Sequence, residues 1–193
     1  MPSRNASASA PEHFAAALAA LRAATVRPEV RLTEVPAPTR IAPYAVALTA
    51  DVISPADREE ELASGRFVLL HDPSCPDAWG GAWRAVTFAR AELEPEFGTD
   101  PMLSEVAWSW LEEALTGQGL AVHGEAGTVT RVISESFGGM GDRPATVEVE
   151  IRASWSPEHD DDGRSLSAWC DLLCQVAGLP PLPEGVVAFP GRR

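Results

Sequence analysis

One segment of the sequence gathers several groups that could do chemistry. Between positions 71 and 83 it holds an imidazole, two carboxylates, a thiol and two indoles, those of His71, Asp72, Cys75, Asp77, Trp79 and Trp83. The segment follows Phe67–Leu70, a continuous apolar run that predicts a strand buried on both faces. Loops at strand ends often hold functional groups on a rigid scaffold. We therefore regard these six residues as a candidate ligand-binding site.

A structural role and two chemical roles are open for this loop. The structural one is turn formation by Asp72-Pro73 and Cys75-Pro76, with Trp79 filling a gap in the core. The second is ligand binding. The third is catalysis, in which His71 would activate Cys75 as a nucleophile. The pattern favours them in that order, because the members of a catalytic group usually meet from distant positions in the chain.

The other motifs lack the spacing of a metal or cofactor site. Residues 158–163 imitate the start of a calcium loop, but the position that needs a bidentate Glu is Trp169. Cys170 and Cys174 are four residues apart among apolar neighbours, which is typical of a helix face turned to the core. The glycines at 138–141 precede a strand rather than a helix, which indicates a hairpin turn. The sequence predicts neither a metal nor a cofactor.

The composition argues against several classes of enzyme and partner. The 193 residues include 28 acids and 15 bases, all of them Arg, and the formal net charge is −13. Without Lys the chain lacks the amine that P-loop, Schiff-base, pyridoxal-phosphate and protein-kinase sites use. It also lacks the clustered positive charge that attracts nucleic acids and anionic membranes. We expect an acidic surface that binds neither of them.

The cysteines and the N-terminal segment both favour a cytoplasmic location. Three Cys are too few for a disulfide framework, and an odd number suits a reducing compartment. The apolar run at 14–21 follows Glu12 and His13, which indicates an amphipathic helix rather than a signal peptide. No stretch approaches the roughly 20 apolar residues that span a bilayer.

Apolar periodicity predicts the scaffold that must hold the loop. It indicates three helices, at 11–25, 100–117 and 165–177. It also indicates strands at 30–35, 44–53, 67–70, 128–137 and 146–155. Residues 83–93 fit a helix or a strand, and their β-forming side chains favour a strand.

These elements predict an α+β fold in which an antiparallel sheet carries the three helices mainly on one face. Their order also leaves open a division into two α-β-β halves. Residues 11–178 are expected to form a single domain. A disordered tail would precede it at 1–10, and a Pro-rich tail would follow it at 179–193.

Several stretches resemble a known family. They are Arg66–Pro73, Val106–Leu111, Gly127–Val132, Glu150–Trp155, Ala168–Asp171 and Ala177–Pro181. Together they are similar to an actinobacterial family catalogued as domain of unknown function three thousand, over nearly all of the chain after the N-terminal tail. The resemblance implies no activity and no site residues. It implies a gene neighbourhood with a ribonuclease-D-like exonuclease, which makes that enzyme a candidate partner.

The leading hypothesis is a non-enzymatic interaction module whose acidic surface meets a basic protein. Trp is favoured at interface hot spots, and Trp108 is the expected anchor, within an exposed patch that also includes Trp79 and Trp83. Trp155 and Trp169 fall on apolar faces and are expected in the core. The alternative is a small-molecule-binding protein or a Cys- and His-dependent enzyme that uses the 71–83 loop.

Overall fold

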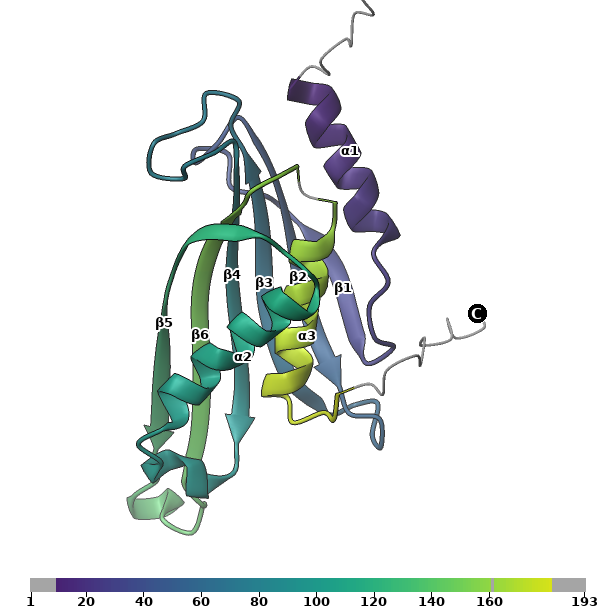
Figure 1. Cartoon of the computed structure of the whole chain (residues 1–193). Coiled ribbons are helices and arrows are strands. Elements are labelled where there is room, and N and C mark those ends of the chain that lie inside the picture. Colours follow the sequence, from purple (N-terminus) through teal and green to yellow (C-terminus); the bar gives the residue numbers. More distant parts are fainter. Residues whose placement is uncertain (1–9, 161, 182–193) are drawn as a thin grey trace, which may run out of the picture.

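Six antiparallel strands form one twisted sheet (Figure 1) in the computed structural model, which describes residues 10–160 and 162–181. The strands are β1 (Val30–Val35), β2 (Tyr44–Ile53), β3 (Glu61–His71), β4 (Trp83–Leu93), β5 (Val122–Ser134) and β6 (Thr146–Pro157). Their spatial order is β1-β2-β3-β4-β6-β5. The first four follow one another as a meander, and β6 then returns between β4 and the edge strand β5.

The helices pack on one face of this sheet. They are α1 (Ala10–Ala23), α2 (Leu103–Gly117) and α3 (Arg164–Val176), with the short 3-10 helices η1 (Pro95–Thr99) and η2 (Gly138–Met140). The pair α2 and α3 crosses the strands side by side, whereas α1 lies near β1 and β2 (Figure 1). Among the described residues, no helix covers the opposite face, and no helix is long and apolar enough to cross a membrane. The predicted α+β class and the helices on one face are confirmed.

Some predicted boundaries and one predicted division are wrong. Strand β3 begins at Glu61, well before the apolar run, because pairing with β2 and β4 holds polar residues in the strand. For residues 83–93 the favoured prediction of a strand is confirmed, because they form β4. The described chain does not divide into two α-β-β halves, since four strands follow α1 and two follow α2. Of the predicted tails, Ala10 belongs to α1, and residues 1–9 and 182–193 lie outside the described residues.

The core lies between the sheet and α3. Alternation along β6 turns one set of side chains toward the helices, and each is at most 4% exposed: Val147, Val149, Ile151, Ala153 and Trp155. Helix α3 packs against β3 and β4 on the same face, and its buried residues include Cys170 and Cys174, which are 3% exposed. Both cysteines and both predicted core indoles are therefore core residues, as their periodicity indicates.

Trp169 of α3 is seated over a glycine in the sheet. The Trp169 side chain is fully buried, its Nε1 donates to the Phe88 carbonyl at 3.1 Å, and its ring centroid is 5.7 Å from that of Phe67. A Cβ on Gly65 would lie 2.8 Å from Trp169 Cζ2 and 2.3 Å from the Phe88 carbonyl oxygen. The close approach of α3 to the sheet thus requires a residue without a side chain at position 65.

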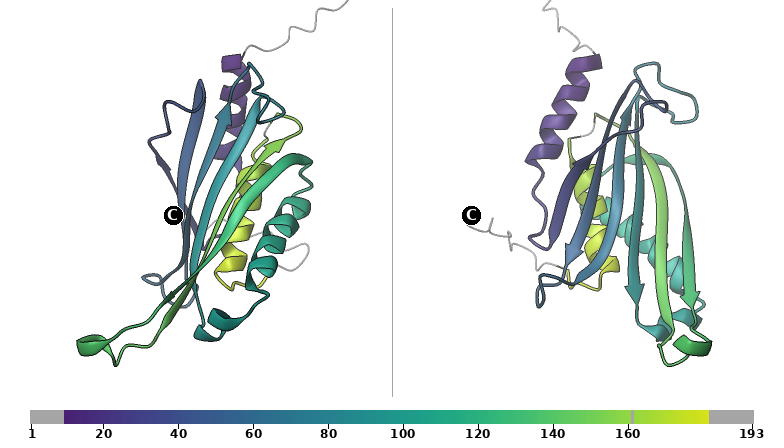
Figure 2. Two further views of the ribbon diagram at one scale, coloured as in Figure 1. Left: turned by 90° about the vertical axis from the view of Figure 1, so that its left-hand side faces the viewer. Right: turned by 180° about the vertical axis from the view of Figure 1, so that it is seen from behind.

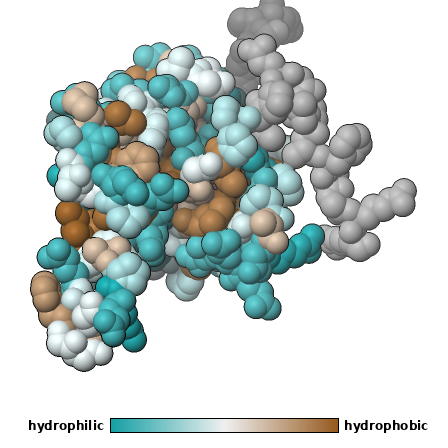
Figure 3. Space-filling model, turned by 90° about the horizontal axis from the view of Figure 1, so that it is seen from below, coloured by the Kyte–Doolittle hydropathy of each residue, from teal (hydrophilic) through white to brown (hydrophobic). Residues whose placement is uncertain are grey.

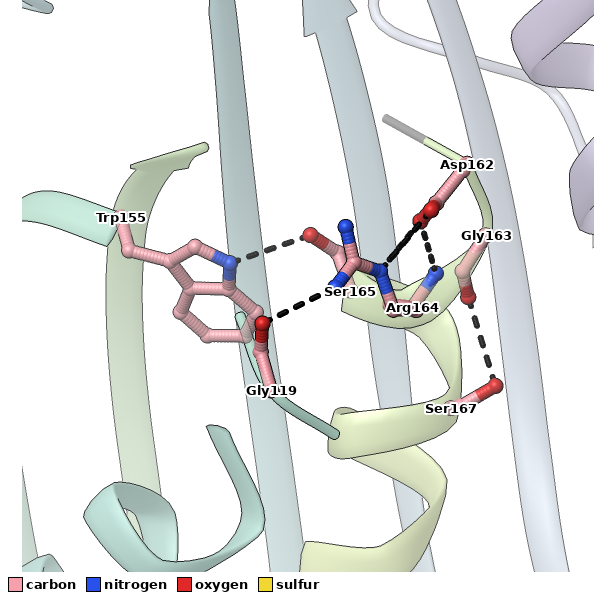
Figure 4. Close-up of polar contacts among 7 residues, drawn as sticks. All are labelled: Gly119, Trp155, Asp162, Gly163, Arg164, Ser165 and Ser167. Carbon is pink, nitrogen blue, oxygen red and sulfur yellow. Dashed lines mark hydrogen bonds and ion pairs between the residues drawn. The ribbon is translucent and has the colours of Figure 1, made fainter. Parts of the chain in front are cut away.

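Polar contacts fix the first turn of α3 to its surroundings (Figure 4). Trp155 Nε1 donates to Ser165 Oγ at 3.2 Å, which ties the helix to β6. The Arg164 guanidinium donates to Asp162 at 2.8 Å and to the Gly119 carbonyl at 2.9 Å. Arg164 therefore joins the start of α3 to the turn that follows α2, so the two helices are held together at this end.

Replacement of Gly65 by Ala should destabilise the protein. The added Cβ would force Trp169 and the β4 backbone apart, and overpacking of this kind costs about 1–3 kcal/mol. Thermal unfolding followed by circular dichroism measures the effect. The matched control is Gly139→Ala in the β5–β6 turn, where a Cβ meets nothing within 4 Å. Equal melting temperatures for the two variants would contradict this account of the helix–sheet contact.

Candidate functional site

The predicted loop joins the paired ends of β3 and β4. His71 and Trp83 face each other across the two strands, and the Asp72 amide donates to the Ala82 carbonyl at 2.8 Å, which closes the loop. Asp72 Oδ1 accepts hydrogen bonds from the Ser74 amide at 2.9 Å and the Ser74 hydroxyl at 2.7 Å. These bonds lower the pKa of Asp72 and place its carboxylate in a turn.

The structure does not bring Cys75 to His71. Cys75 is exposed, with a backbone φ of 51°, and its Sγ lies 3.8 Å from the Pro73 carbonyl oxygen. His71 is 4% exposed, and neither of its ring nitrogens has a hydrogen-bond partner in the described part of the chain. Asp77 is exposed on the same loop. This arrangement contains no thiol–imidazole pair of the kind that activates a nucleophile.

Aromatic rings enclose the His71 imidazole. Its centroid lies 4.1 Å from that of Trp83, 5.7 Å from Tyr44 and 6.5 Å from Phe14, which reaches it from α1. Burial lowers the pKa of His71, although the Ala82 backbone and nearby carboxylates act in the opposite direction. The environment therefore favours the neutral imidazole. Neither Phe14 nor Tyr44 has a sequence motif that marks this role.

Asp160 joins α1 to this cluster. One of its carboxylate oxygens accepts from Trp83 Nε1 at 3.0 Å, and the other lies 2.5 Å from His13 Nδ1. Burial by itself would raise the pKa of Asp160, but these two hydrogen bonds lower it on balance. No local motif in the sequence could predict this contact, because His13 and Asp160 are 147 positions apart. Trp83 is 3% exposed, so its predicted place in an exposed patch is wrong.

A polar cleft of about 580 Å³ lies beside this cluster. Its side chains include Trp83, His123, Glu158, His159 and Asp160. Of the six predicted site residues, Trp83 alone lines it. His123 Nε2 is 3.1 Å from the Trp79 carbonyl, which anchors the predicted loop to β5. No set of three or more His, Cys, Asp or Glu in the described residues has the geometry to hold a metal ion.

Trp108 has a different environment from the one expected of an exposed anchor. It is half-buried on α2, and a Cβ on Gly127 of β5 would lie 2.7 Å from its Cζ3. The ring therefore packs closely over the β5 backbone, while Nε1 donates to Glu112 Oε1 at 2.9 Å. Trp79 is also half-buried, but on the β3–β4 loop. The three indoles do not form one exposed patch.

A second cleft, of about 600 Å³, lies between α2 and the start of β5. Trp108, Leu111, Leu115, Leu120 and Val122 give it an apolar wall. Three carboxylates also line it, those of Glu112, Glu125 and Glu158, and none of the described residues that line it is basic. Glu112 accepts from the Trp108 indole, and Glu125 interacts electrostatically with Arg84 outside the cleft. An indole beside three carboxylates is suited to a cationic side chain. We name this site the acidic cleft.

The two cysteines of α3 are unsuited to chemistry. Burial raises the pKa of Cys174 to about 12 and raises that of Cys170 further. A thiol acts as a nucleophile or metal ligand in its deprotonated form, which burial disfavours here.

The structure so far defines an α+β protein with an antiparallel sheet, helices on one face and an acidic cleft beside α2. A family model described as "Protein of unknown function (DUF3000)" matches residues 10–187. The chain belongs to this family. Neither a search of the curated proteins nor a search of the solved structures finds a match.

Acidification should destabilise the fold through His71. The unfolded state takes up a proton near pH 6.5, whereas the folded state resists it because burial lowers the pKa of His71. The contribution of neutral His71 is thus complete above about pH 6.5 and is lost as pH falls from there toward the folded-state pKa. Melting temperatures between pH 7.5 and 5 measure this loss.

The His71→Phe variant keeps an aromatic ring at this position and cannot titrate. We expect its melting temperature to fall less than that of the wild type over the same range. His159→Gln, which changes an exposed histidine, should follow the wild type. Parallel pH profiles for the wild type and His71→Phe would show that His71 does not control this dependence.

Proposed function

We propose that this protein is a non-enzymatic interaction module that binds a basic protein partner along α2. The observation that supports this most directly is the acidic cleft, where three carboxylates and the Trp108 ring line a space of about 600 Å³ and no described lining residue is basic. An Arg or Lys side chain of the partner would neutralise the carboxylates and lie against the indole.

The charge of α2 extends this site beyond the cleft. The helix contains three acids, Glu105, Glu112 and Glu113, all exposed, and no base. With a formal net charge of −13, the whole chain would also attract a basic partner over distance. Electrostatic attraction of this kind raises the association rate and disfavours acidic competitors.

Apolar side chains continue the proposed interface past the start of α2. We define the distal patch as six exposed residues around η1, the start of α2 and the β5–β6 turn: Phe97, Met102, Val106, Ile133, Phe137 and Met140. Figure 3 looks onto this end of the molecule, where apolar areas lie among polar ones. Phe and Met are enriched in interface cores, so this patch would supply apolar contact at the other end of α2 from the charged cleft.

The alternative site at the 71–83 loop has weaker support. Its Asp72 carboxylate is used in a turn, His71 lies beneath aromatic rings, and Cys75 contacts no base. The polar cleft beside it is suited to a small polar ligand, which keeps ligand binding as the second candidate. We place the interaction in the cytoplasm, because the three cysteines are free and a reducing compartment keeps them so.

Neutralisation of the acidic cleft should abolish partner capture. The triple variant Glu112→Gln, Glu125→Gln, Glu158→Gln removes three negative charges at exposed positions, so the fold should be retained. The tagged protein is used to capture partners from an extract of its native cells, and recovery is quantified by mass spectrometry. We expect a basic protein with the wild type and at least a tenfold loss with the variant.

A matched triple variant changes Glu59, Glu60 and Glu61 to Gln, which alters the net charge equally on another part of the surface. It should capture the partner as the wild type does. Equal losses for both triple variants would mean that only overall charge matters, and the α2 site would be rejected.

The distal patch should contribute independently of charge neutralisation. Phe137 is 75% exposed, so Phe137→Asp should leave stability unchanged while it places a charge in the proposed apolar contact. We expect at least a fivefold loss of partner recovery in the same capture measurement. Ile41→Asp is the control, because Ile41 is 60% exposed and lies in the β1–β2 connection, outside the distal patch. Equal recovery with both variants would exclude the patch from the interface.

A further inference from the structure

The face of the sheet opposite the helices has its own pattern. Seen from behind, the strands lie in front of α2 and α3 (Figure 2). Cross-strand pairing sets Arg66 of β3, Phe88 of β4 and Arg152 of β6 in one row. The Arg152 guanidinium carbon lies 5.0 Å from the centroid of the Phe88 ring, a cation–π contact. The Phe88 ring thus has the Arg152 guanidinium group against it, and Arg66 occupies the neighbouring position on β3.

An apolar floor adjoins this row. Two residues farther along the strands, Val68 of β3 pairs with Val86 of β4, and Val86 is 40% exposed. These side chains and Phe88 line an open groove of about 710 Å³ that extends across β3, β4, β6 and β5. The groove is open to solvent, and an open surface of this kind suits a segment of extended chain better than an enclosed small molecule.

A third guanidinium group lies beyond the floor, on the outward side of β4. Arg84 donates to the hydroxyl groups of Ser154 at 2.6 Å and Ser156 at 3.2 Å. Arg66 donates to the Pro36 carbonyl at 3.1 Å. Neither arginine forms an ion pair with a carboxylate of the described residues, although the chain has 28 acids. A neutral acceptor holds Arg66, whereas Arg84 also interacts electrostatically with Glu125. Neither guanidinium group forms a close ion pair with that or another described carboxylate, so both can attract a ligand carboxylate.

We propose that this groove binds an extended acidic peptide in which two acids flank an apolar residue, each separated from it by one intervening residue. Side chains at alternate positions of an extended chain point the same way, so the two acids and the apolar residue would all face the sheet. One acid would lie over the Arg66 and Arg152 row. The apolar side chain would then lie over Val86, and the second acid over Arg84.

The spacing of the sheet matches such a peptide. Phe88 and Arg84 are four residues apart on β4, which corresponds to about 13 Å at the rise of an antiparallel strand. Two acids at positions i and i+4 of an extended peptide are separated by the same distance. Arg152 is exposed in its ion pair with Glu150, whose side chain is 20% exposed, so a ligand carboxylate would share the guanidinium group with Glu150.

The charges on this face favour a peptide over a nucleic acid. Glu148 and Glu150 also lie on the outward side of β6, where they pair with Arg90 and Arg152. A polyanion has a charge at every phosphate and would meet these carboxylates along the strand. A peptide has neutral residues between its acids, so only the acid over the Arg66 and Arg152 row would meet one of them, that of Glu150. The groove differs from the acidic cleft in both position and charge, so the two sites would take different partners.

Fluorescence anisotropy tests this proposal with the full-length protein. The probe is a fluorescein-labelled peptide with the central pattern Asp-Ser-Leu-Ser-Asp between Gly-Ser flanks. The control peptide has the same composition but places both acids side by side. We expect saturable binding of the first peptide, at least fivefold weaker binding of the control, and weaker binding at 0.5 M than at about 0.05 M salt because charges are screened.

Variants assign the binding to the groove. Arg66→Gln and Arg84→Gln should each weaken binding of the probe at least fivefold, while Arg143→Gln, near the β5–β6 turn, should not. Arg66 is exposed, so its replacement tests the site even if Arg84→Gln lowers stability. Equal binding of both peptides, or unchanged binding by both groove variants, would overturn the proposal.

Two further results would replace the peptide by another occupant. A labelled oligothymidylate that binds more tightly than the peptide, with a loss on Arg66→Gln, would assign the groove to a nucleic acid. Concentration-dependent self-association in analytical ultracentrifugation, abolished by Arg66→Gln, would assign it to a second copy of the chain. Each of these outcomes rejects the acidic peptide.

Discussion

The contact between Trp169 and Gly65 determines how the molecule is layered. A helix that approaches this closely buries its whole apolar face, and the Trp169 indole gains the Phe88 carbonyl as a hydrogen-bond partner. The contact requires a strand position without a side chain, because a Cβ at residue 65 would meet backbone and indole atoms. Once α3 is seated, α2 packs beside it and covers the β5 side of the same face. The other face then has no described helix to cover it.

This one-sided packing separates the charges of an acidic protein. The acids of α2 and of the β6–α3 connection surround the acidic cleft on the helix side. Four arginines point outward from the other face: Arg66, Arg84, Arg90 and Arg152. Guanidinium groups present several donors in a fixed plane, which suits recognition of carboxylates. Glu148 and Glu150 also lie on this face, so its charges are mixed, whereas those of the acidic cleft are all negative.

The sequence predicts the fold better than it predicts the site. Clean alternation along β6 and the apolar stripe of α3 identify the core, because period-2 and period-3.6 patterns depend on local chain geometry. Strand β3 is longer than predicted because its polar half is held by neighbouring strands. The 71–83 loop concentrates reactive residue types, yet the fold buries His71 and leaves Cys75 exposed. The partners of His71, namely Phe14, Tyr44 and Trp83, come from separate elements, and no local pattern indicates that they meet.

The acidic cleft could likewise not be predicted from the sequence, since Glu112, Glu125 and Glu158 lie on three different segments. Trp108 was the one part of it that the sequence singled out. Its half-buried position over Gly127 makes it a wall of the cleft rather than a free anchor. A large ring held rigidly by the fold loses little conformational entropy when a partner packs against it.

The absence of lysine from the chain permits a direct test of the proposed function. A carbodiimide joins carboxylates to amines, so apart from the N-terminal amine every cross-link to a captured partner joins an acid of this chain to a lysine or N-terminus of that partner. Mass spectrometry of the cross-linked complex then locates the interface on this chain. The account predicts cross-links at Glu112, Glu125 and Glu158. Cross-links confined to Glu59–Glu61 or to Asp77 of the 71–83 loop would contradict it.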